Sequence, residues 1–195
     1  MGRIFYVMGR SASGKDTIYK KLLETFPQLK RLVTYTTRPM REGEQEGEEY
    51  HFTTEQALEE CREAGRLIEQ RVYQTVAGPW TYATVDDGSF RPEGADSLIG
   101  IGTLESWNRL REYYGDDVLF PIYIETDPGT LLERALRRER KQAKPRYTEL
   151  CRRFLADESD FSEEKIRAAG IVRRYRNEVL EACLAEIVKD MIHYV

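Results

Sequence analysis

The 195-residue chain has no long apolar run, few cysteines and no large excess of charge of either sign. The apolar run at residues 4–8 is too short for a secretory signal or a membrane span. Cys61, Cys151 and Cys183 lie far apart and form no C-x-x-C pair, which argues against a disulfide framework or a zinc site. We therefore expect a cytoplasmic protein without a membrane-bound part.

The charge balance is nearly even, with 30 Lys and Arg residues against 34 Asp and Glu residues and a formal net charge of -4. Such a balance disfavours nonspecific attraction to nucleic acids or acidic membranes, so we expect neither as a partner and expect any anion site to be local. Charged residues make up 33% of the chain, yet the apolar 41% recurs in blocks, which is typical of a charge-rich globular α/β domain. The composition gives no indication of oligomeric state.

A glycine-rich loop near the N-terminus joins a predicted strand to a predicted helix. Residues 4–8 are β-formers, and from Lys15 onward apolar residues recur every four positions, at Ile18, Leu22 and Phe26. The intervening loop matches the phosphate-loop signature G-x-x-x-x-G-K, in the strand and helix context that the signature requires. Its backbone N–H groups and the helix N-terminus can bind the phosphates of ATP. The predicted phosphate-binding residues are Gly9, Ser11, Ala12, Ser13, Gly14, Lys15, Asp16 and Thr17.

One position departs from this signature, because Asp16 stands where a Ser or Thr hydroxyl normally meets Mg²⁺. Three interpretations stay open. Asp16 binds the ion itself, or Thr17 replaces the missing hydroxyl, or Asp16 is only a favourable charge in the first turn of the helix. We expect Mg²⁺ to accompany ATP, with Asp16 and Thr17 as candidate ligands.

The middle third of the chain is predicted to form a separate small lobe. Thr53 and Gln56 form a capping box for a helix that should end at Gly65. Residues 67–68 and 71–76 alternate β-formers with polar side chains, which is typical of a half-exposed sheet.

The last hundred residues are predicted to complete a parallel sheet and to add a helical lid. Residues 97–101 and 118–124 are apolar strands around a helix of period 3.6, and residues 171–175 form a last strand. Asp127 followed by Pro128 starts a helix that a basic stretch, residues 134–146, interrupts. Ser162 and Asn177 are predicted to cap the two helices that follow.

A second candidate anion site lies in the polar stretch after residue 33. Arg38 and Arg41 flank Pro39, which fixes the turn, so two guanidinium groups can converge on one phosphate with the Tyr50 hydroxyl as a further donor. Two arginines alone are also typical of a solvated basic loop.

This stretch resembles the guanylate kinase family, whose motif reads S-x-T-T-R-P-x-R-x-G-E-x-x-G-x-x-Y-x-F. Only the leading Ser differs, being Thr34, which keeps the hydroxyl. The weaker family motifs L-x-x-R-x-x-x-R and N-x-x-L-E are similar to residues 131–138 and 177–181.

The resemblance implies a P-loop NTPase-type three-layer α/β fold with a parallel sheet core at about residues 1–33, 95–128 and 165–195. It further implies an inserted mixed-sheet lobe at about 34–94, a lid at about 129–164, and transfer of the γ-phosphoryl group of ATP to GMP and to dGMP. The implied GMP-binding residues are Thr34, Arg38, Arg41, Tyr50, Glu69, Tyr82 and Thr84. The implied catalytic residues are Lys15, Arg41, Arg134, Arg138 and one of Arg152 or Arg153, with Arg153 preferred.

Glu69 makes chemical sense in this role, because a carboxylate can accept both N1–H and N2–H₂ of guanine but finds an acceptor at N1 of adenine. A surface charge on a strand is the alternative for Glu69.

Two departures from the family stand out. Tyr82-Ala83-Thr84 replaces Tyr-Gly-[ST], and the sequence from Gly100 to Gly102 replaces a D-x-D pair. We expect another carboxylate to compensate for the lost acidic pair, with Asp16 as the first candidate and Asp96 as the second. Three other functions stay open: a kinase for another small phosphate such as ribose bisphosphate, a non-catalytic binding module and a generic P-loop ATPase.

Overall fold

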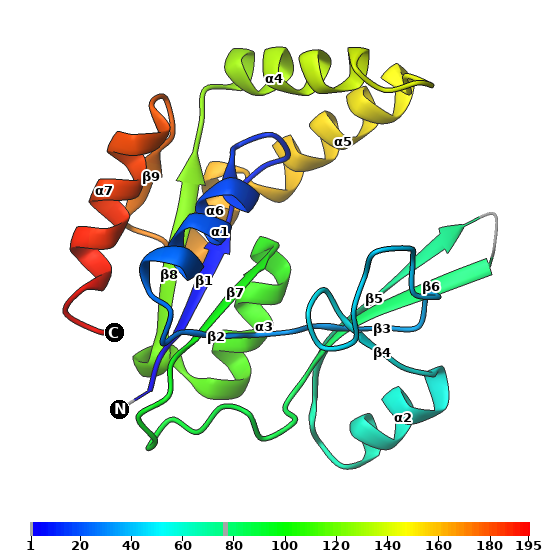
Figure 1. Cartoon of the computed structure of the whole chain (residues 1–195), viewed down its shortest axis with the longest axis vertical. Coiled ribbons are helices and arrows are strands. Elements are labelled where there is room, and N and C mark those ends of the chain that lie inside the picture. Colours follow the sequence, from blue (N-terminus) through cyan, green and yellow to red (C-terminus); the bar gives the residue numbers. More distant parts are fainter. Residues whose placement is uncertain (1, 76–77) are drawn as a thin grey trace.

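The computed structural model describes residues 2–75 and 78–195. Its core is a five-stranded sheet in the order β2-β7-β1-β8-β9, and all four strand pairings are parallel (Figure 1). The strands are β1 (Ile4–Met8), β2 (Lys30–Arg31), β7 (Leu98–Gly102), β8 (Leu119–Glu125) and β9 (Arg174–Arg176). The predicted parallel core is therefore confirmed, although its last strand begins three residues later than expected.

Helices cover both faces of this sheet because alternate residues of β1 point to opposite sides. Phe5 and Val7 pack in one cluster with α1 (Lys15–Thr25) and α7 (Leu180–Met191). Ile4, Tyr6 and Met8 pack in the other cluster, which includes α3 (Leu104–Tyr114) and α6 (Glu163–Ala168). A short 3₁₀ helix, η1 (Asp116–Val118), leads from α3 into β8. The three-layer arrangement places the end of β1, and thus the loop after it, at the centre of the carboxyl edge.

A second sheet projects from the core, to the right in Figure 1. Its order is β4-β3-β6-β5, and one helix, α2 (Glu55–Glu63), packs beside it. The strands are β3 (Tyr35–Thr36), β4 (His51–Phe52), β5 (Leu67–Thr75) and β6 (Gly78–Val85). The two short strands expected at 67–68 and 71–76 are one continuous strand with a register shift between Leu67 and Glu69, and Val76 lies outside the described residues. Helix α2 is capped by the Thr54 side chain, one residue later than predicted.

Two helices, α4 (Pro128–Arg140) and α5 (Tyr147–Asp160), cross above the core in Figure 1. The predicted cap at Asp127 is confirmed, because its carboxylate accepts the Thr130 N–H at 3.0 Å. The predicted cap at Ser162 is also confirmed, by the Lys165 N–H at 3.4 Å. The predicted cap at Asn177 is wrong: α7 begins only at Leu180, and Asn177 is buried. Among the described residues, no helix combines the length and the apolar character needed to cross a membrane.

The ring of Tyr6 fills the space beside Gly100 and Gly102. A Cβ at Gly100 would lie 2.8 Å from the Tyr6 ring, and a Cβ at Gly102 would overlap the Tyr6 hydroxyl and lie 2.8 Å from Ser106 Oγ. The Tyr6 hydroxyl donates to Ser106 Oγ at 2.8 Å, and burial raises its pKa to about 12. The two glycines are therefore required by a tyrosine in the neighbouring strand, which explains why the acidic pair is missing.

We predict that Gly102→Ala lowers the free energy of unfolding by about 1–3 kcal/mol, because a single added methyl group overpacks this site. Urea unfolding of the variant measures the loss. In a Tyr6→Leu background the same substitution should cost much less. Equal losses in the two backgrounds would show that Tyr6 does not impose the glycine.

Candidate functional site

The loop between β1 and α1 has the backbone of an anion-binding nest. Ala12 and Gly14 both adopt left-handed conformations, with φ of 66° and 91°. Gly14 is the N-cap residue of α1 and has no side chain, so the first amide groups of the helix are available to a phosphate. A side chain at Gly14 would also overlap the Asn177 amide, so both the conformation and the packing require glycine here.

Asn177 supports this loop from behind. Its Nδ2 donates to the Ser13 carbonyl at 2.7 Å, and the Thr126 hydroxyl donates to the same carbonyl at 3.4 Å. Arg134 in turn donates from Nη2 to the Asn177 carbonyl at 3.0 Å. Residues that follow β8 and β9, together with Arg134 in the middle of α4, are therefore linked to the phosphate loop. Sequence reasoning missed this role because an Asn ahead of a helix is typical of a cap.

The carboxylate of Asp16 faces the second sheet. Its side chain is 78% exposed and lies 3.7 Å from Lys15 Nζ. Asp16 lines a cavity of about 740 Å³ together with Thr34 and Tyr50. Thr17 is not among the residues that line this cavity; it lines a neighbouring hollow of about 280 Å³, which Asp16 also borders. The fold thus brings Asp16, rather than Thr17, next to the predicted acceptor residues.

The prediction that Asp96 could replace the acidic pair is wrong. It precedes β7, whose first residue, Leu98, pairs with Ile4 at the start of β1. The phosphate loop follows the other end of β1, so Asp96 lies at the opposite edge of the sheet. Its carboxylate is engaged by Lys30 at 2.6 Å.

The donor set around Asp16 fits Mg²⁺ bound together with a nucleotide. Mg²⁺ usually keeps several waters and takes one or two protein carboxylates plus substrate phosphates. A dedicated protein cage is not needed, and the described residues contain no group of three or more His, Cys, Asp or Glu side chains suited to hold a metal. One exposed carboxylate beside a phosphate nest is the arrangement that such an ion requires.

The C-terminal end of α5 touches the phosphate loop with two carboxylates. Asp157 accepts the Ser11 N–H at 2.5 Å, and Glu158 forms an ion pair with Arg10. Arg10 also donates to the Phe161 carbonyl at 3.2 Å. An internal carboxylate thus occupies one of the backbone amides that a phosphate would use.

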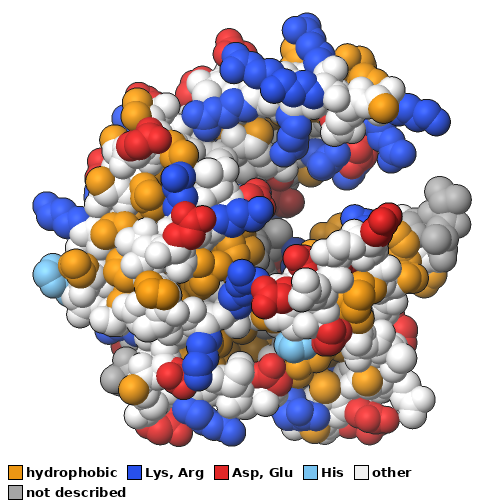
Figure 2. All heavy atoms as spheres, in the orientation of Figure 1, with side chains coloured by type: hydrophobic (Ala, Val, Ile, Leu, Met, Phe, Trp, Pro, Cys, Tyr) orange, Lys and Arg blue, Asp and Glu red, His pale blue; other side chains and the backbone are white. Residues whose placement is uncertain are grey.

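The predicted lid arginines take different positions. Arg138 and Arg153 line one small cavity with Ser11 of the phosphate loop, so the fold brings these three together. Arg152 forms a bidentate pair with Glu149, at 2.8 and 2.7 Å, and Arg153 also pairs with Glu149, at 3.2 Å. Figure 2 shows Lys and Arg side chains gathered on the lid, above a hollow that separates it from the second sheet.

One face of the second sheet carries most of the predicted acceptor residues. Glu69 pairs with Thr84 across the β5–β6 ladder, and Arg71 pairs with Tyr82. Residues two apart on a strand share a face, so these four side chains lie together. The Tyr82 ring contacts that of Tyr50 with centroids 5.6 Å apart, which continues the face toward β4.

Arg38 and Arg41 lie at the Tyr50 end of this face. Arg38 is buried, stacks over the Tyr50 ring at 4.9 Å and pairs with both oxygens of Glu44 at 2.8 and 2.5 Å. The side-chain bond to Arg38 and the backbone N–H of Arg41 lower the pKa of Glu44 to about 2. Arg41 lies over the Trp80 ring at 5.9 Å. Glu44 therefore fixes the orientation of the Arg38 guanidinium and accepts hydrogen bonds from two of its nitrogens in the absence of a phosphate.

Glu69 lies at the other end of the face and is not a surface charge. It is 7% exposed, and its Oε1 accepts the Thr84 hydroxyl at 2.9 Å. Arg71 donates to both of its oxygens, at 3.1 and 3.4 Å. Thr34 stands just before β3, where its carbonyl accepts the His51 N–H at 2.9 Å. Sequence reasoning missed Arg71, for which the sequence carries no motif signal.

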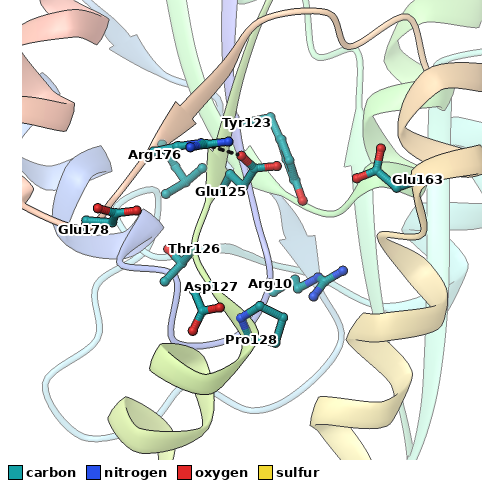
Figure 3. A pocket seen from close by; sticks show the side chains of 10 residues that line it. Arg10, Tyr123, Glu125, Thr126, Asp127, Pro128, Glu163, Arg176 and Glu178 are labelled. Carbon is teal, nitrogen blue, oxygen red and sulfur yellow. Dashed lines mark hydrogen bonds and ion pairs between the residues drawn. The ribbon is translucent and has the colours of Figure 1, made fainter.

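A further cavity of about 370 Å³ opens beside the phosphate loop, between Arg10 and the start of α4 (Figure 3). Four carboxylates line it, those of Glu125, Asp127, Glu163 and Glu178, against the guanidinium groups of Arg10 and Arg176. The excess of negative charge disfavours a triphosphate there. The phosphate nest and the second-sheet face remain the better candidate site.

A phosphate nest at the carboxyl edge of a parallel sheet, with an inserted sheet that carries a second anion site, defines a P-loop NTPase fold of the nucleotide-binding class. The comparisons with known proteins narrow this class. A family model described as guanylate kinase matches residues 1–85.

Two curated relatives extend that match over nearly the whole chain. Guanylate kinase of Ralstonia nicotianae is 32% identical over 188 residues, which cover 95% of this chain and 79% of that protein. Guanylate kinase of Cupriavidus pinatubonensis is 30% identical over 188 residues, which cover 95% of this chain and 81% of that protein. A crystal structure of guanylate kinase from Anaplasma phagocytophilum shares the fold, with a TM-score of 0.63 at 20% identity over 98% of this chain and 85% of that chain. The chain belongs to the guanylate kinase family.

We predict that Asp157→Asn tightens the binding of ATP by about 3- to 10-fold, because a carboxylate no longer competes for the Ser11 amide. Calorimetric titration measures the change. Asp160→Asn, on the same helix and with an ion pair to Lys165 at 3.6 Å, is the matched control. Unchanged or weaker ATP binding in Asp157→Asn would contradict the competition.

Proposed function

We propose that the protein transfers the γ-phosphoryl group of ATP to GMP, and also to dGMP. The observation that carries the proposal is the pairing of two anion sites of different design. The phosphate nest follows the central strand of the core, and the second-sheet face combines Arg38 and Arg41 with a buried base-directed carboxylate, Glu69. A generic ATPase would have no use for the second site.

The acceptor residues divide by the chemistry that they offer. Arg38, Arg41, Tyr50 and Tyr82 supply cationic and hydroxyl donors for the GMP phosphate, and Glu44 keeps the Arg38 fork oriented before GMP arrives. Thr34, Glu69 and Thr84 supply acceptors and hydroxyls for the guanine edge. The structure places Glu69 and Thr84 in direct contact, which supports a shared role.

Phosphoryl transfer between two phosphates needs little acid or base assistance, because the attacking oxygen is already anionic near neutral pH. The barrier comes from repulsion between anions and from misalignment, so cations must be placed along the line of transfer. Lys15 from the phosphate loop, Arg41 from the second sheet, and Arg134, Arg138 and Arg153 from the lid are the residues that we assign to this task. Mg²⁺ supplies further charge neutralisation when it is bound with ATP, and Asp16 would hold it, with Thr17 as the alternative.

Closure of the lid and the second sheet over the core would exclude water and limit hydrolysis of ATP. The hollow between lid and second sheet leaves room for such a movement (Figure 2). The cytoplasmic location stays a prediction from the composition.

The direct test is formation of ADP from ATP and Mg²⁺ with a panel of acceptors: GMP, dGMP, AMP, UMP and ribose bisphosphate. We expect turnover with GMP and dGMP. Turnover with ribose bisphosphate alone would replace the proposal by the small-phosphate kinase, and ADP formation without any acceptor would indicate an ATPase.

We predict that Arg41→Met raises the KM for GMP by about 10-fold or more and leaves the KM for ATP unchanged, because we assign this guanidinium to the acceptor phosphate and not to the binding of ATP. Steady-state kinetics with each substrate varied in turn measure both constants. Arg62→Met is the matched control, since Arg62 also belongs to the second-sheet region but is paired with Glu59 on the exposed side of α2. Equal effects on both substrates would remove Arg41 from the acceptor site.

Asp16→Ala should raise the Mg²⁺ concentration that gives half-maximal turnover, because the carboxylate beside the nest is lost. Thr17→Ala, one residue further along α1, should have a much smaller effect. A Mg²⁺ titration of turnover in both variants decides between the two ligands. The reverse order would assign the metal to Thr17.

A further inference from the structure

We propose that Arg71 is a specificity-determining residue that reads the 6-oxo group of the acceptor base beside Glu69. The proposal rests on the proposed transfer to GMP and assigns to that site a residue for which the sequence motif gives no role. It concerns which purine monophosphates the protein accepts.

The position of Arg71 is set by the ladder of the second sheet. Arg71 lies two residues after Glu69 on β5, opposite Tyr82, so it shares the face of the predicted acceptor residues. Its guanidinium spans from Glu69 to the core, where Nη1 donates to Thr103 Oγ1 at 3.4 Å. Arg71 therefore stands at the seam where the second sheet meets the end of β7.

Arg71 and Glu69 can still form hydrogen bonds with a ligand. An arginine has five N–H donors, and contacts with the described residues use three of them, two toward Glu69 and one toward Thr103. Glu69 Oε1, the oxygen beside Arg71 Nη2, accepts Nη2 at a long 3.4 Å and the Thr84 hydroxyl at 2.9 Å, so a base N–H can replace the longer contact. One side of Arg71 also borders open space, because Arg71 lines a cavity of about 410 Å³ with Tyr73 and Thr103; Glu105 and Asp160 also line this cavity, and Glu69 does not.

Arg71 Nη2 keeps a second N–H and lies beside Glu69 Oε1, so the pair presents a donor next to an acceptor. The edge of a 6-oxopurine presents the complementary order, with the N1–H donor next to the O6 acceptor. Glu69 would accept N1–H while an Arg71 Nη–H donates to O6. Adenine presents the reverse order, an acceptor at N1 and a donor at N6, so both contacts would be mismatched and left unpaired.

The surroundings of the pair favour this division of labour. Gly100 and Gly102 leave no acidic side chain at the end of β7, and the Tyr6 ring fills that space. Reading of the 2-amino group is thus left to the Glu69 and Thr84 side, away from the guanidinium. Arg71 is therefore expected to influence selectivity at position 6 of the base and not at position 2.

The test compares kcat/KM for GMP, 6-thio-GMP and IMP in the wild-type protein and in Arg71→Met. Replacement of O6 by sulfur weakens the acceptor at position 6 and keeps the N1–H and 2-amino donors, whereas IMP keeps O6 and N1–H and lacks the 2-amino group. In the wild type we expect GMP to be preferred over 6-thio-GMP by about 10-fold or more. In Arg71→Met we expect that preference to fall to within about 3-fold, while the GMP to IMP ratio stays within about 3-fold of the wild-type value.

Arg109→Met is the matched control, because Arg109 pairs with Glu112 on the exposed side of α3 and should leave both ratios unchanged. Arg71→Lys keeps the charge but loses the fork, and it should give an intermediate ratio at position 6; it also serves if Arg71→Met does not fold.

An unchanged ratio of GMP to 6-thio-GMP overturns the inference. So does an equal change in both ratios, which would mean that Arg71 only positions Glu69. If the wild type turns over GMP in either case, the proposed function stands and the inference alone fails. Absence of GMP turnover in the wild type removes the proposed function, and the inference with it.

Discussion

The pairing of β1 on both of its edges is the constraint on which the rest of the molecule depends. All five residues of β1 are buried, and each pairs with β7 on one side and β8 on the other. Because the three strands run parallel and in register, Met8, Gly102 and Tyr123 lie at the same level of the sheet, where β1 and β7 end. The phosphate loop, the start of α3 and the approach to the lid therefore meet at one edge without any one segment having to reach across the core.

The second sheet and the lid are attached to this edge by a few apolar side chains in the core cluster, such as Ile68 and Phe161, and by polar contacts. Arg71 bridges β5 to Thr103, and Asp157 and Glu158 join α5 to the phosphate loop. Partly exposed polar contacts contribute little to stability compared with a buried apolar cluster, so they can be exchanged when substrates bind. The core can stay rigid while its two attachments rearrange, which is what a kinase with two substrates needs.

The parts of the fold that local sequence signals determine could be predicted. The β1 strand, the phosphate loop and α1 follow from a change of hydrophobic period around two glycines, and Asp127 with Pro128 marks a helix start wherever it occurs. The predictions for Asn177 and Asp96 were wrong for different reasons. Asn177 contacts a residue that is distant in the chain, and Asp96 lies at the edge of the sheet opposite the phosphate loop. Asn177 contacts Ser13 across 164 positions, and no local pattern encodes such a contact. Tyr6 likewise has the pattern of an ordinary strand residue, and only its position beside β7 explains the two glycines.

For the candidate site, the motif from Thr34 to Phe52 located the arginines, whereas Glu44, Asp157 and Arg71 emerge only from the three-dimensional arrangement.

Glu44 and Asp157 have a shared consequence for the energetics of ligand binding. Each places a carboxylate of the protein itself on a group that a phosphate is expected to use. Binding is then an exchange of one anion for another at each site, and the displaced carboxylate returns to water. Because an exchange changes the local charge less than the filling of a bare cationic pocket, the affinity should respond weakly to ionic strength. Inorganic phosphate and sulfate, which lack a base or a second phosphate to offset the displacement, should be poor competitors for either site.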